Sequence, residues 1–244
     1  MDLGISGRRA AVAAASRGLG FATAAALANE GVRVAVCSRN ADAIEDAANR
    51  IGHDAVPLTA DVSTTNGARG FVDAARDALG GIDILVTNAG GPPPGDFSST
   101  SVDQYLAALE LNCLSVIAMC DVAVPPMREQ RWGRVVAITS IAVRQPIPQL
   151  ILSNTARAGA TGFLKTLARE VAGDGVTVNS LQPGMHDTER VRQLGNRDLD
   201  GIPAGVLGRP EDFGALAAFV SSEHARFLTG TAIQVDGGAY AGLL

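Results

Sequence analysis

The chain has 244 residues, of which 47% are hydrophobic and 18% are charged, and its formal net charge is −5. This content of apolar side chains is enough for a sizeable core and excludes a largely disordered chain, whereas the acidic balance without a long basic run excludes general electrostatic binding to nucleic acid. The length suits one α/β domain, and no linker, repeat or low-complexity segment divides it, so we expect a single domain over residues 1–244.

Short apolar runs alternate with helix-favouring segments along the chain. We predict strands at 8–15, 33–39, 53–62, 82–87, 134–139, 176–181 and 232–235. Helices are predicted between them at 21–29, 41–51, 66–79, 103–124, 150–172 and 211–223. This alternation predicts a single-domain α/β Rossmann fold, in which a doubly wound parallel sheet of about seven strands carries helices on both faces. Residues 185–209 show no clear period and are rich in glycine, which indicates a mobile flap with some local helix.

The three cysteines, Cys37, Cys113 and Cys120, stand in apolar strand-like or helix-like stretches. An odd number in such surroundings indicates buried free thiols and not a disulfide framework. No uninterrupted apolar segment is long enough to span a membrane, and the N-terminus does not open with an apolar signal core. We therefore expect a cytoplasmic protein without membrane contact, and we predict no metal site.

The turn after the first predicted strand is the first candidate binding site. It reads Ser16-Arg17-Gly18-Leu19-Gly20 and leads directly into a helix. Backbone N–H groups at the start of a helix point toward an anion, and glycines let a phosphate come close. The turn therefore predicts binding of a dinucleotide pyrophosphate, and its place after the first strand adds weight to a Gly-x-Gly pair that means little alone.

Two arginines bear on the choice of cofactor. Arg17 lies in this turn, and Arg39 follows Ser38 at the end of the second predicted strand. An acid at that strand end would bind a free ribose 2′-hydroxyl, whereas arginine favours a 2′-phosphate through fork-shaped charged hydrogen bonds. We therefore predict NADP(H) in preference to NAD(H). The alternative is that both arginines are solvated surface residues.

Further motifs follow in order along the chain. They are Asp61-Val62, Thr87-Asn88-Ala89-Gly90 after a DILV strand, Asn112, Ser140, Pro183-Gly184 with Thr188, Gly208-Arg209-Pro210-Glu211-Asp212 and Val235-Asp236-Gly237-Gly238. Together with the glycine turn, this ordered set resembles the short-chain dehydrogenase/reductase superfamily over nearly the whole chain. It is most similar to the 3-oxoacyl-(acyl-carrier-protein) reductase branch of that superfamily.

The resemblance implies a role for each motif. The residues that would line the adenosine and ribose side of the cofactor are Asp61, Val62, Asn88, Ala89 and Gly90. Those that would hold its carboxamide end are Pro183, Gly184 and Thr188. Asn112 and Ser140 would belong to the catalytic group, and the last strand would support a homo-oligomer, either a tetramer or a dimer.

The phosphate turn departs from the family's pattern at its start. Ala13 and Ala14 stand where the family has threonine and its first glycine. The threonine hydroxyl is lost, and the Cβ atom of Ala14 would crowd the pyrophosphate. Because L-residues rarely adopt positive φ, we expect Ala14 to tolerate this turn only with a negative φ. Gly18 and Gly20 keep the prediction of a cofactor in place.

The larger departure concerns the catalytic residues. The family places tyrosine thirteen residues after its serine and lysine four residues later; counted from Ser140, these positions hold Ser153 and Arg157. A serine hydroxyl is too weak an acid to protonate an alkoxide, and arginine keeps its proton. Arg157 would still stabilise an oxyanion and hold ribose hydroxyls from the helix face that it shares with Ser153. We predict a catalytic group of Asn112, Ser140, Ser153 and Arg157.

The proton donor is then open. Water is one source, and His186, two residues after Pro183-Gly184, is another because histidine titrates near neutrality. The alternative for His186 is an exposed loop position without a catalytic role.

Three functions fit these residues. The first is an NADP(H)-dependent oxidoreductase that acts on a small carbonyl or alcohol substrate with an atypical active site. The second is a non-redox lyase, dehydratase or isomerase that uses Ser140 and Arg157 to stabilise an oxyanion. The third is a catalytically silent nucleotide-binding or regulatory protein. Fold alone does not choose between these functions. A hydride-transfer assay would distinguish the oxidoreductase from the other two. The cofactor motifs favour the oxidoreductase.

Overall fold

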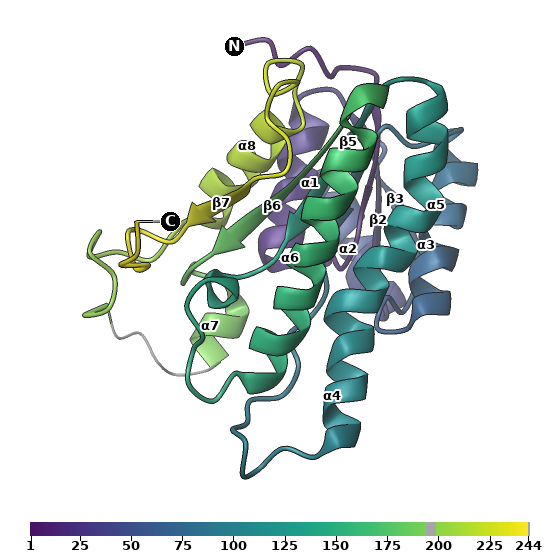
Figure 1. Cartoon of the computed structure of the whole chain (residues 1–244). Coiled ribbons are helices and arrows are strands. Elements are labelled where there is room, and N and C mark those ends of the chain that lie inside the picture. The colour runs from purple at the N-terminus through teal and green to yellow at the C-terminus, as the bar shows by residue number, and fades with distance from the viewer. Residues whose placement is uncertain (194–198, 244) are drawn as a thin grey trace.

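Seven strands pair side by side into one parallel sheet in a computed structural model that describes residues 1–193 and 199–243. Their order is β3-β2-β1-β4-β5-β6-β7, and every pairing is parallel (Figure 1). The strands are β1 Arg9–Val12, β2 Arg33–Ser38, β3 Val56–Thr59, β4 Ile84–Thr87, β5 Gly133–Ile138, β6 Val176–Pro183 and β7 Ala232–Val235. The predicted Rossmann fold is confirmed, and the strand order reverses between β1 and β4, where such folds bind their ligands.

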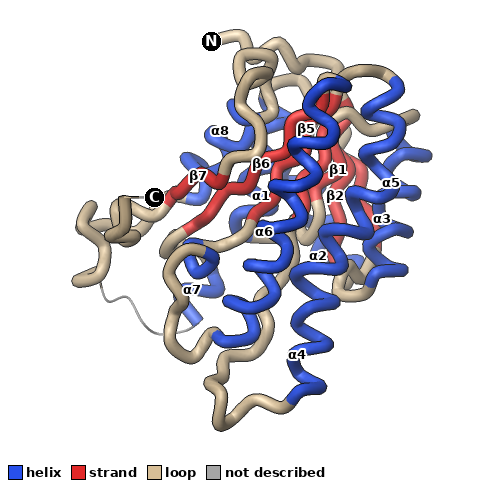
Figure 2. The backbone as a smooth tube through the Cα atoms, viewed as in Figure 1, coloured by secondary structure: helices blue, strands red, loops and turns tan. Residues whose placement is uncertain are grey.

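Helices cover both faces of the sheet (Figure 2). The α-helices are α1 Gly18–Asn29, α2 Ala41–Ile51, α3 Thr65–Leu79, α4 Val102–Leu109, α5 Ser115–Glu129, α6 Ile151–Val171, α7 Glu189–Gln193 and α8 Pro210–Val220. Residues that alternate along one strand enter different cores: Ala11 packs with α3, α5 and α6, whereas Ala10 and Val12 pack with α1, α2 and α8. Because both faces are buried, the strands consist of continuous apolar runs, which is the feature that made them recognisable in the sequence.

The predicted helix at 103–124 differs from the observed structure in two ways. A π-helical segment, Glu110–Leu114, interrupts the stretch between α4 and α5, and α5 continues through Pro125 and Pro126 to Glu129. Prolines normally end a helix because they lack an N–H donor. Here the next residue, Met127, is fully buried in the core, and this tertiary packing outweighs the two missing hydrogen bonds.

The composite helix Val102–Glu129 is the one stretch among the described residues that is long and apolar enough to cross a membrane. More than half of its most apolar window is buried inside the protein, and α5 packs against α3 on the sheet. It is therefore a core helix of this fold. The three cysteines are free and buried, as predicted.

The predicted flap at 185–209 contains the short helix α7 at Glu189–Gln193. An isolated bridge between His186 and Gly208 holds the two ends of this segment together. Its residues 194–198 lie outside the described part of the chain. Figure 1 shows α7 and the start of α4 at the end of the sheet toward which the strands point.

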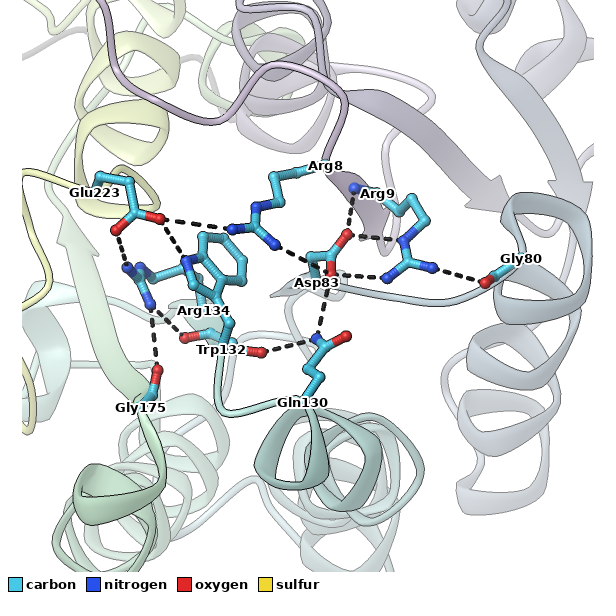
Figure 3. Close-up of polar contacts among 10 residues, drawn as sticks. Arg8, Arg9, Gly80, Asp83, Gln130, Trp132, Arg134, Gly175 and Glu223 are labelled. Atoms are coloured by element: carbon cyan, nitrogen blue, oxygen red, sulfur yellow. Dashed lines mark hydrogen bonds and ion pairs between the residues drawn. The ribbon is translucent and has the colours of Figure 1, made fainter.

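The opposite end of the sheet is held by a polar cluster around Asp83 (Figure 3). The Asp83 carboxylate accepts hydrogen bonds from the backbone N–H and the Nε of Arg9, at 2.9 and 2.8 Å, and from Gln130 at 3.2 Å. Next to it, the guanidinium groups of Arg8 and Arg134 both face the Trp132 ring, 3.8 and 4.3 Å from its centroid. The cluster joins β1, β4 and β5 far from the predicted cofactor turn.

Candidate active site

All the predicted site residues lie at the carboxyl edge of the sheet. Because the strands are parallel, the loops that follow them meet at one edge. The glycine turn follows β1, Arg39 follows β2, and Asp61-Val62 comes just after β3. Asn88, Ala89 and Gly90 follow β4, Ser140 follows β5, and Pro183-Gly184 ends and follows β6. Residues scattered over the sequence are thus brought together by topology.

The glycine turn forms a tight cradle against the loop after β4. Gly18 begins α1 with φ +62°, a conformation that favours glycine. A Cβ atom on Gly20 would lie 2.6 Å from the carbonyl oxygen of Ala14 and 2.7 Å from Nδ2 of Asn88. Asn88 donates a hydrogen bond to that same carbonyl at 3.1 Å. These contacts hold the start of α1 against the loop after β4. No side chain caps the N–H groups that open the helix, so these residues fit a dinucleotide pyrophosphate.

Ala14 adopts φ +48°, so the expectation of a negative φ is wrong. The backbone follows the turn that a glycine would make, because Ala14 is fixed by the Asn88 hydrogen bond and by the close approach of Gly20. An alanine in this left-handed region is strained by roughly 1–2 kcal/mol. The tight turn is therefore present although the backbone of Ala14 is strained.

Replacing Ala14 by glycine should therefore stabilise the protein. We expect the free energy of unfolding to rise by about 1 kcal/mol, since the relieved strain exceeds the extra entropy of glycine in the unfolded chain. Urea unfolding measures this. Ala15→Gly is the matched control: Ala15 is fully buried and is not among the described residues with positive φ, so that variant should lose stability. A loss of stability in Ala14→Gly of the same size as in the control would refute the strain argument.

The two arginines predicted to select the cofactor take different positions. Arg17 forms an ion pair with Glu189 of α7 at 2.8 Å, across the turn and toward the flap. Arg39 is exposed at the end of β2. Hydrogen bonding from Ser63 lowers the pKa of Asp61, and the charge of Arg39 lowers it further. Arg39 is thus exposed within electrostatic reach of Asp61, whereas Arg17 spans from the phosphate turn to the flap.

Asn112 lies in the π-helical segment Glu110–Leu114 and is buried. Its Nδ2 donates a hydrogen bond to the carbonyl oxygen of Gly90 at 2.9 Å. Its Oδ1 is buried without a hydrogen-bond partner among the described residues. Single π-helical turns often mark functional positions, because the extra residue reorients a side chain. Here the π-helical turn joins the long helix to the loop after β4.

Ser140 and Arg157 both lie at the carboxyl end of β5, and Ser153 stands one turn before Arg157 on α6. Ser140 begins a short 3-10 turn, where its Oγ accepts a hydrogen bond from the backbone N–H of Ala142 at 3.1 Å, which leaves its own proton to donate. An Nη of Arg157 donates to the carbonyl oxygen of Ile138 at 3.1 Å. Leu152 packs toward α4, so Ser153 and Arg157, four residues apart, share the neighbouring face of α6. The arrangement offers one hydroxyl donor and one fixed positive charge.

The segment after β6 places Thr188 beside the glycine turn and Gly184 against the loop that follows β7. A Cβ atom on Gly18 would meet the methyl group of Thr188 at 3.7 Å, and one on Gly184 would meet the backbone of Asp236 at 2.8 Å. Thr188 is thus in van der Waals reach of the turn, and Asp236 leaves no room for a larger residue at Gly184.

His186 is 4% exposed, so its assignment to an exposed loop is wrong. Its ring packs edge-on against Phe213 of α8, and Nδ1 lies 3.2 Å from the carbonyl oxygen of Gly184. Burial lowers the pKa of His186. The sequence placed it in the loop but carried no signal that Phe213 would cover it.

Sequence reasoning missed two polar residues at this edge. Glu189, the partner of Arg17, was not singled out within the predicted flap. Gln182 of β6 is completely buried and lies one residue before Pro183. The available signal for Gln182 was a single long polar residue at the end of an otherwise apolar strand.

The chain is similar to known reductases over almost its whole length. A family model described as enoyl-(acyl carrier protein) reductase matches residues 13–240. The 3-oxoacyl-(acyl-carrier-protein) reductase FabG of Vibrio cholerae is 30% identical over 242 residues, which cover 98% of this chain and 99% of that protein. The 3-oxoacyl-(acyl-carrier-protein) reductase of Synechocystis sp. is 34% identical over 236 residues, or 94% of this chain and 95% of that one.

A solved structure agrees with these relatives. L-sorbose reductase from Gluconobacter frateurii, complexed with NADPH and L-sorbose, superposes with a TM-score of 0.93 at 28% identity and covers 100% of both chains. The fold, the order of the motifs and these matches lead to one conclusion: the chain belongs to the short-chain dehydrogenase/reductase superfamily, a family of oxidoreductases.

Proposed function

We propose that the protein is an NADP(H)-dependent oxidoreductase that interconverts a small carbonyl compound and its alcohol through an atypical active site. The observation that carries the proposal is the glycine cradle at the start of α1, where a Cβ atom on Gly20 would collide with Ala14 and Asn88. The chain keeps this close approach although Ala14 is strained at φ +48°. Retention of a strained phosphate turn supports a bound dinucleotide.

The residues present fit NADP(H). The pyrophosphate would lie against the backbone of Ser16, Gly18, Leu19 and Gly20. Arg39 would meet the 2′-phosphate, which a guanidinium binds in a fork. The groups that would line the adenosine side are Asp61, Val62, Asn88, Ala89 and Gly90, and those at the carboxamide end are Pro183, Gly184 and Thr188. A similar protein, L-sorbose reductase, was solved with NADPH, which supports the same cofactor here.

Arg17 has a second role in this proposal. Its ion pair with Glu189 links the phosphate turn to α7, and both side chains are more than half exposed. Exposed ion pairs contribute little free energy, so a 2′-phosphate or pyrophosphate competes easily for Arg17. The ion pair is then a weak link between the phosphate turn and α7. Arg39 is the main determinant of NADP(H) preference.

The catalytic chemistry needs a hydride and a proton, of which the bound NADP(H) supplies or accepts the hydride. Ser140 donates its hydroxyl proton in a hydrogen bond to the substrate oxygen. Arg157 stabilises the negative charge that develops on that oxygen. Ser153 and Arg157 would occupy the positions of the family's tyrosine and lysine, and neither releases a proton near neutral pH. The proton would then come from bulk solvent and reach the alkoxide through water at Arg157, with Asn112 supporting the helix turn beside it.

His186 takes no part in this proposal. Its ring is covered by Phe213, and its lowered pKa keeps it neutral near pH 7. A neutral, enclosed imidazole is unsuited to exchange a proton with substrate at each turnover.

The first experiment is a titration of the protein with NADPH and with NADH, followed by nicotinamide fluorescence and then by a hydride-transfer assay on small ketones and ketoesters. Micromolar binding with tighter binding of NADPH, followed by oxidation of NADPH on addition of substrate, is the expected result. Substrate turnover without a change in NADPH absorbance would favour a lyase or isomerase. Binding without turnover of any kind would favour a regulatory protein.

Arg39→Ala tests the cofactor preference directly. Loss of a charged hydrogen bond to phosphate should weaken NADPH binding about tenfold or more and leave NADH binding nearly unchanged. Arg226→Ala is the control, because Arg226 is also an exposed arginine but lies in the loop between α8 and β7. Equal losses of affinity for NADPH and NADH would show that Arg39 attracts both cofactors by its charge and does not recognise the 2′-phosphate.

We also propose that the enzyme works in the cytoplasm as a homo-oligomer and does not bind nucleic acid. Large apolar side chains such as Phe97, Val102 and Phe227 are strongly exposed, which supports association between copies. Light scattering on the purified protein reports the oligomeric state.

A further inference from the structure

A carboxylate from the flap reaches the phosphate turn. Glu189 is the first residue of α7, and its Oε2 accepts a hydrogen bond of 2.8 Å from an Nη of Arg17, the residue directly before α1. The two residues stand 172 positions apart in the sequence, so only the folded chain brings them together. The contact therefore joins the proposed cofactor site to the flap.

The start of α1 has no acidic residue of its own. Arg17 has the extended backbone of an N-cap residue, but its side chain does not cap the helix, and the first turn of α1 contains no acid. The N–H groups at a helix start carry partial positive charge, which a carboxylate or a phosphate stabilises. These groups and the guanidinium of Arg17 together form a positive region, and Glu189 brings an anion to it.

The segment that leads into α7 is held close to the turn. The backbone N–H of Asp187 donates to the carbonyl oxygen of Gly208 at 2.9 Å. The Asp187 carboxylate accepts two hydrogen bonds from Arg192, at 2.9 and 3.0 Å. A Cβ atom on Gly18 would meet the methyl group of Thr188 at 3.7 Å. The flap carboxylate is therefore brought to the turn by a folded segment.

The paired side chains of Arg17 and Glu189 remain open to solvent. They are 67% and 52% exposed. A phosphate binds a guanidinium as a carboxylate does, through charge-assisted hydrogen bonds. Like charges at the same guanidinium also repel one another. A cofactor phosphate that binds Arg17 therefore either displaces the Glu189 carboxylate or binds against its repulsion.

We propose that Glu189 is an internal competitor of the cofactor, which occupies at Arg17 the place of a cofactor phosphate and so lowers the affinity for the nucleotide. This inference rests on the proposed function and deepens it, because it gives the flap a direct effect on cofactor binding. A phosphate at Arg17 breaks the link between the turn and α7. The phosphate is either the pyrophosphate or the 2′-phosphate, and the test below distinguishes the two.

The displaced carboxylate keeps a second cation nearby. Hydrogen bonding to Asp187 and the charge of Asp187 raise the pKa of Arg192, and the charge of Glu189 raises it further. Glu189 is thus within electrostatic reach of Arg192, which lies three residues later on α7. A shift of the carboxylate from Arg17 toward this guanidinium replaces one favourable charge interaction by another.

Glu189→Gln tests the proposal through cofactor affinity, measured by nicotinamide fluorescence during titration with NADPH and with NADH. Exposed ion pairs change an equilibrium constant only a few-fold, so the dissociation constant should fall about three- to fivefold. A fall for both nucleotides would indicate that the pyrophosphate binds Arg17, and a fall for NADPH alone would indicate the 2′-phosphate. Unchanged dissociation constants for both would overturn the proposal.

Glu211→Gln is the matched control. Glu211 lines the same surface groove as Gly18 and Glu189, but its carboxylate faces Arg209 at 3.9 Å. The variant removes the same charge from the same groove and should leave both dissociation constants unchanged. An equal gain of affinity in the two variants would mean that the negative charge of the groove weakens cofactor binding without any contact to Arg17, and the competition would be refuted.

Removal of the guanidinium gives a readout that a merely structural role of Glu189 would not change. The carboxylate and the phosphate no longer compete when Arg17 is replaced by glutamine. The double variant Arg17→Gln with Glu189→Gln should therefore bind NADPH no more tightly than Arg17→Gln does. A gain from Glu189→Gln that persists in this background would contradict a competition at Arg17.

The same titrations separate this inference from the proposed function. Tighter nucleotide binding by Glu189→Gln in a protein that transfers no hydride would refute the oxidoreductase but keep the competition. Hydride transfer by the unmodified protein, with equal affinities in both proteins, would keep the oxidoreductase and refute the competition. If neither protein binds NADPH or NADH, both proposals fail.

Discussion

Restoring the family's tyrosine and lysine should create a far better carbonyl reductase. In the double variant Ser153→Tyr with Arg157→Lys, we expect kcat/KM for reduction of a small ketoester by NADPH to rise at least about a hundredfold, since a positioned general acid contributes about 10²–10⁴-fold. The tyrosine hydroxyl supplies a proton that serine cannot, and the lysine lowers its pKa. The geometry allows it, because Ser153 and Arg157 are four residues apart on one face of α6, and Arg157 reaches the end of β5.

The matched control replaces Ser153 by phenylalanine together with Arg157→Lys. It adds the same aromatic ring and the same lysine without the hydroxyl. We expect no gain in this variant, so the difference between the two measures the proton donor alone. If the tyrosine variant folds, binds NADPH and still shows no gain over the phenylalanine variant, then the proton relay is not what limits this active site. A further check is the pH profile, which should acquire a new ionisation from the tyrosine.

Replacing Asp83 by asparagine should cause the largest loss of stability that the described structure predicts. The carboxylate is 2% exposed and accepts hydrogen bonds from Arg9 and Gln130. Removal of one member of a buried ion pair costs about 3–5 kcal/mol. We expect about 3 kcal/mol, the low end, because Arg9 and Arg8 remain partly exposed and can be hydrated. Thermal unfolding should show a melting temperature lower by roughly 6–12 °C.

The effect of Asp83→Asn should depend on pH in a defined direction. Burial raises the pKa of Asp83, but the hydrogen bonds and charge of Arg9, together with the charge of Arg8, outweigh it and lower the pKa overall. A carboxyl group whose folded pKa is depressed stabilises the protein above its unfolded pKa of about 3.9, and this contribution is lost as pH falls through the folded pKa. The difference between the two proteins should therefore be full at neutral pH and shrink in acid.

Asp46→Asn serves as the control for Asp83. Asp46 pairs with Arg50 along one exposed face of α2, and exposed pairs of this kind contribute a few tenths of a kcal/mol. Its replacement should leave the melting temperature nearly unchanged. A similarly small effect of Asp83→Asn would show that the polar cluster around Asp83 contributes no more to the free energy of unfolding than an exposed ion pair does.

Most of the fold was predictable because it rests on local patterns. A sheet buried on both faces requires unbroken apolar strands, and the crossovers between parallel strands require helices, so the alternation of segments is visible along the chain. The exceptions are places where packing overrides local preference. Helix α5 passes through Pro125 and Pro126 because Met127 is buried beyond them. The π-helical turn at Asn112 has no sequence pattern of its own.

The candidate site was predictable in its location and less so in its conformation. The motifs follow strand ends, and a parallel sheet gathers strand ends at one edge, so their meeting was expected from order alone. The conformation of Ala14 was predicted with the wrong sign of φ, because the turn is fixed by Asn88 and Gly20 and not by the residue itself. His186 was expected in an exposed loop, yet Phe213 of α8 encloses it.

The sequence by itself determined the family, the order of the secondary structure and the identity of the residues at Ser153 and Arg157, since these depend on which residue stands at which distance along the chain. Only the tertiary structure decided which groups face one another. The pairing of Arg17 with Glu189, the enclosure of His186 and the unpartnered amide of Gln182 all depend on elements far apart in sequence. Whether a polar group is satisfied or exposed is a property of its surroundings, and a one-dimensional pattern does not contain them.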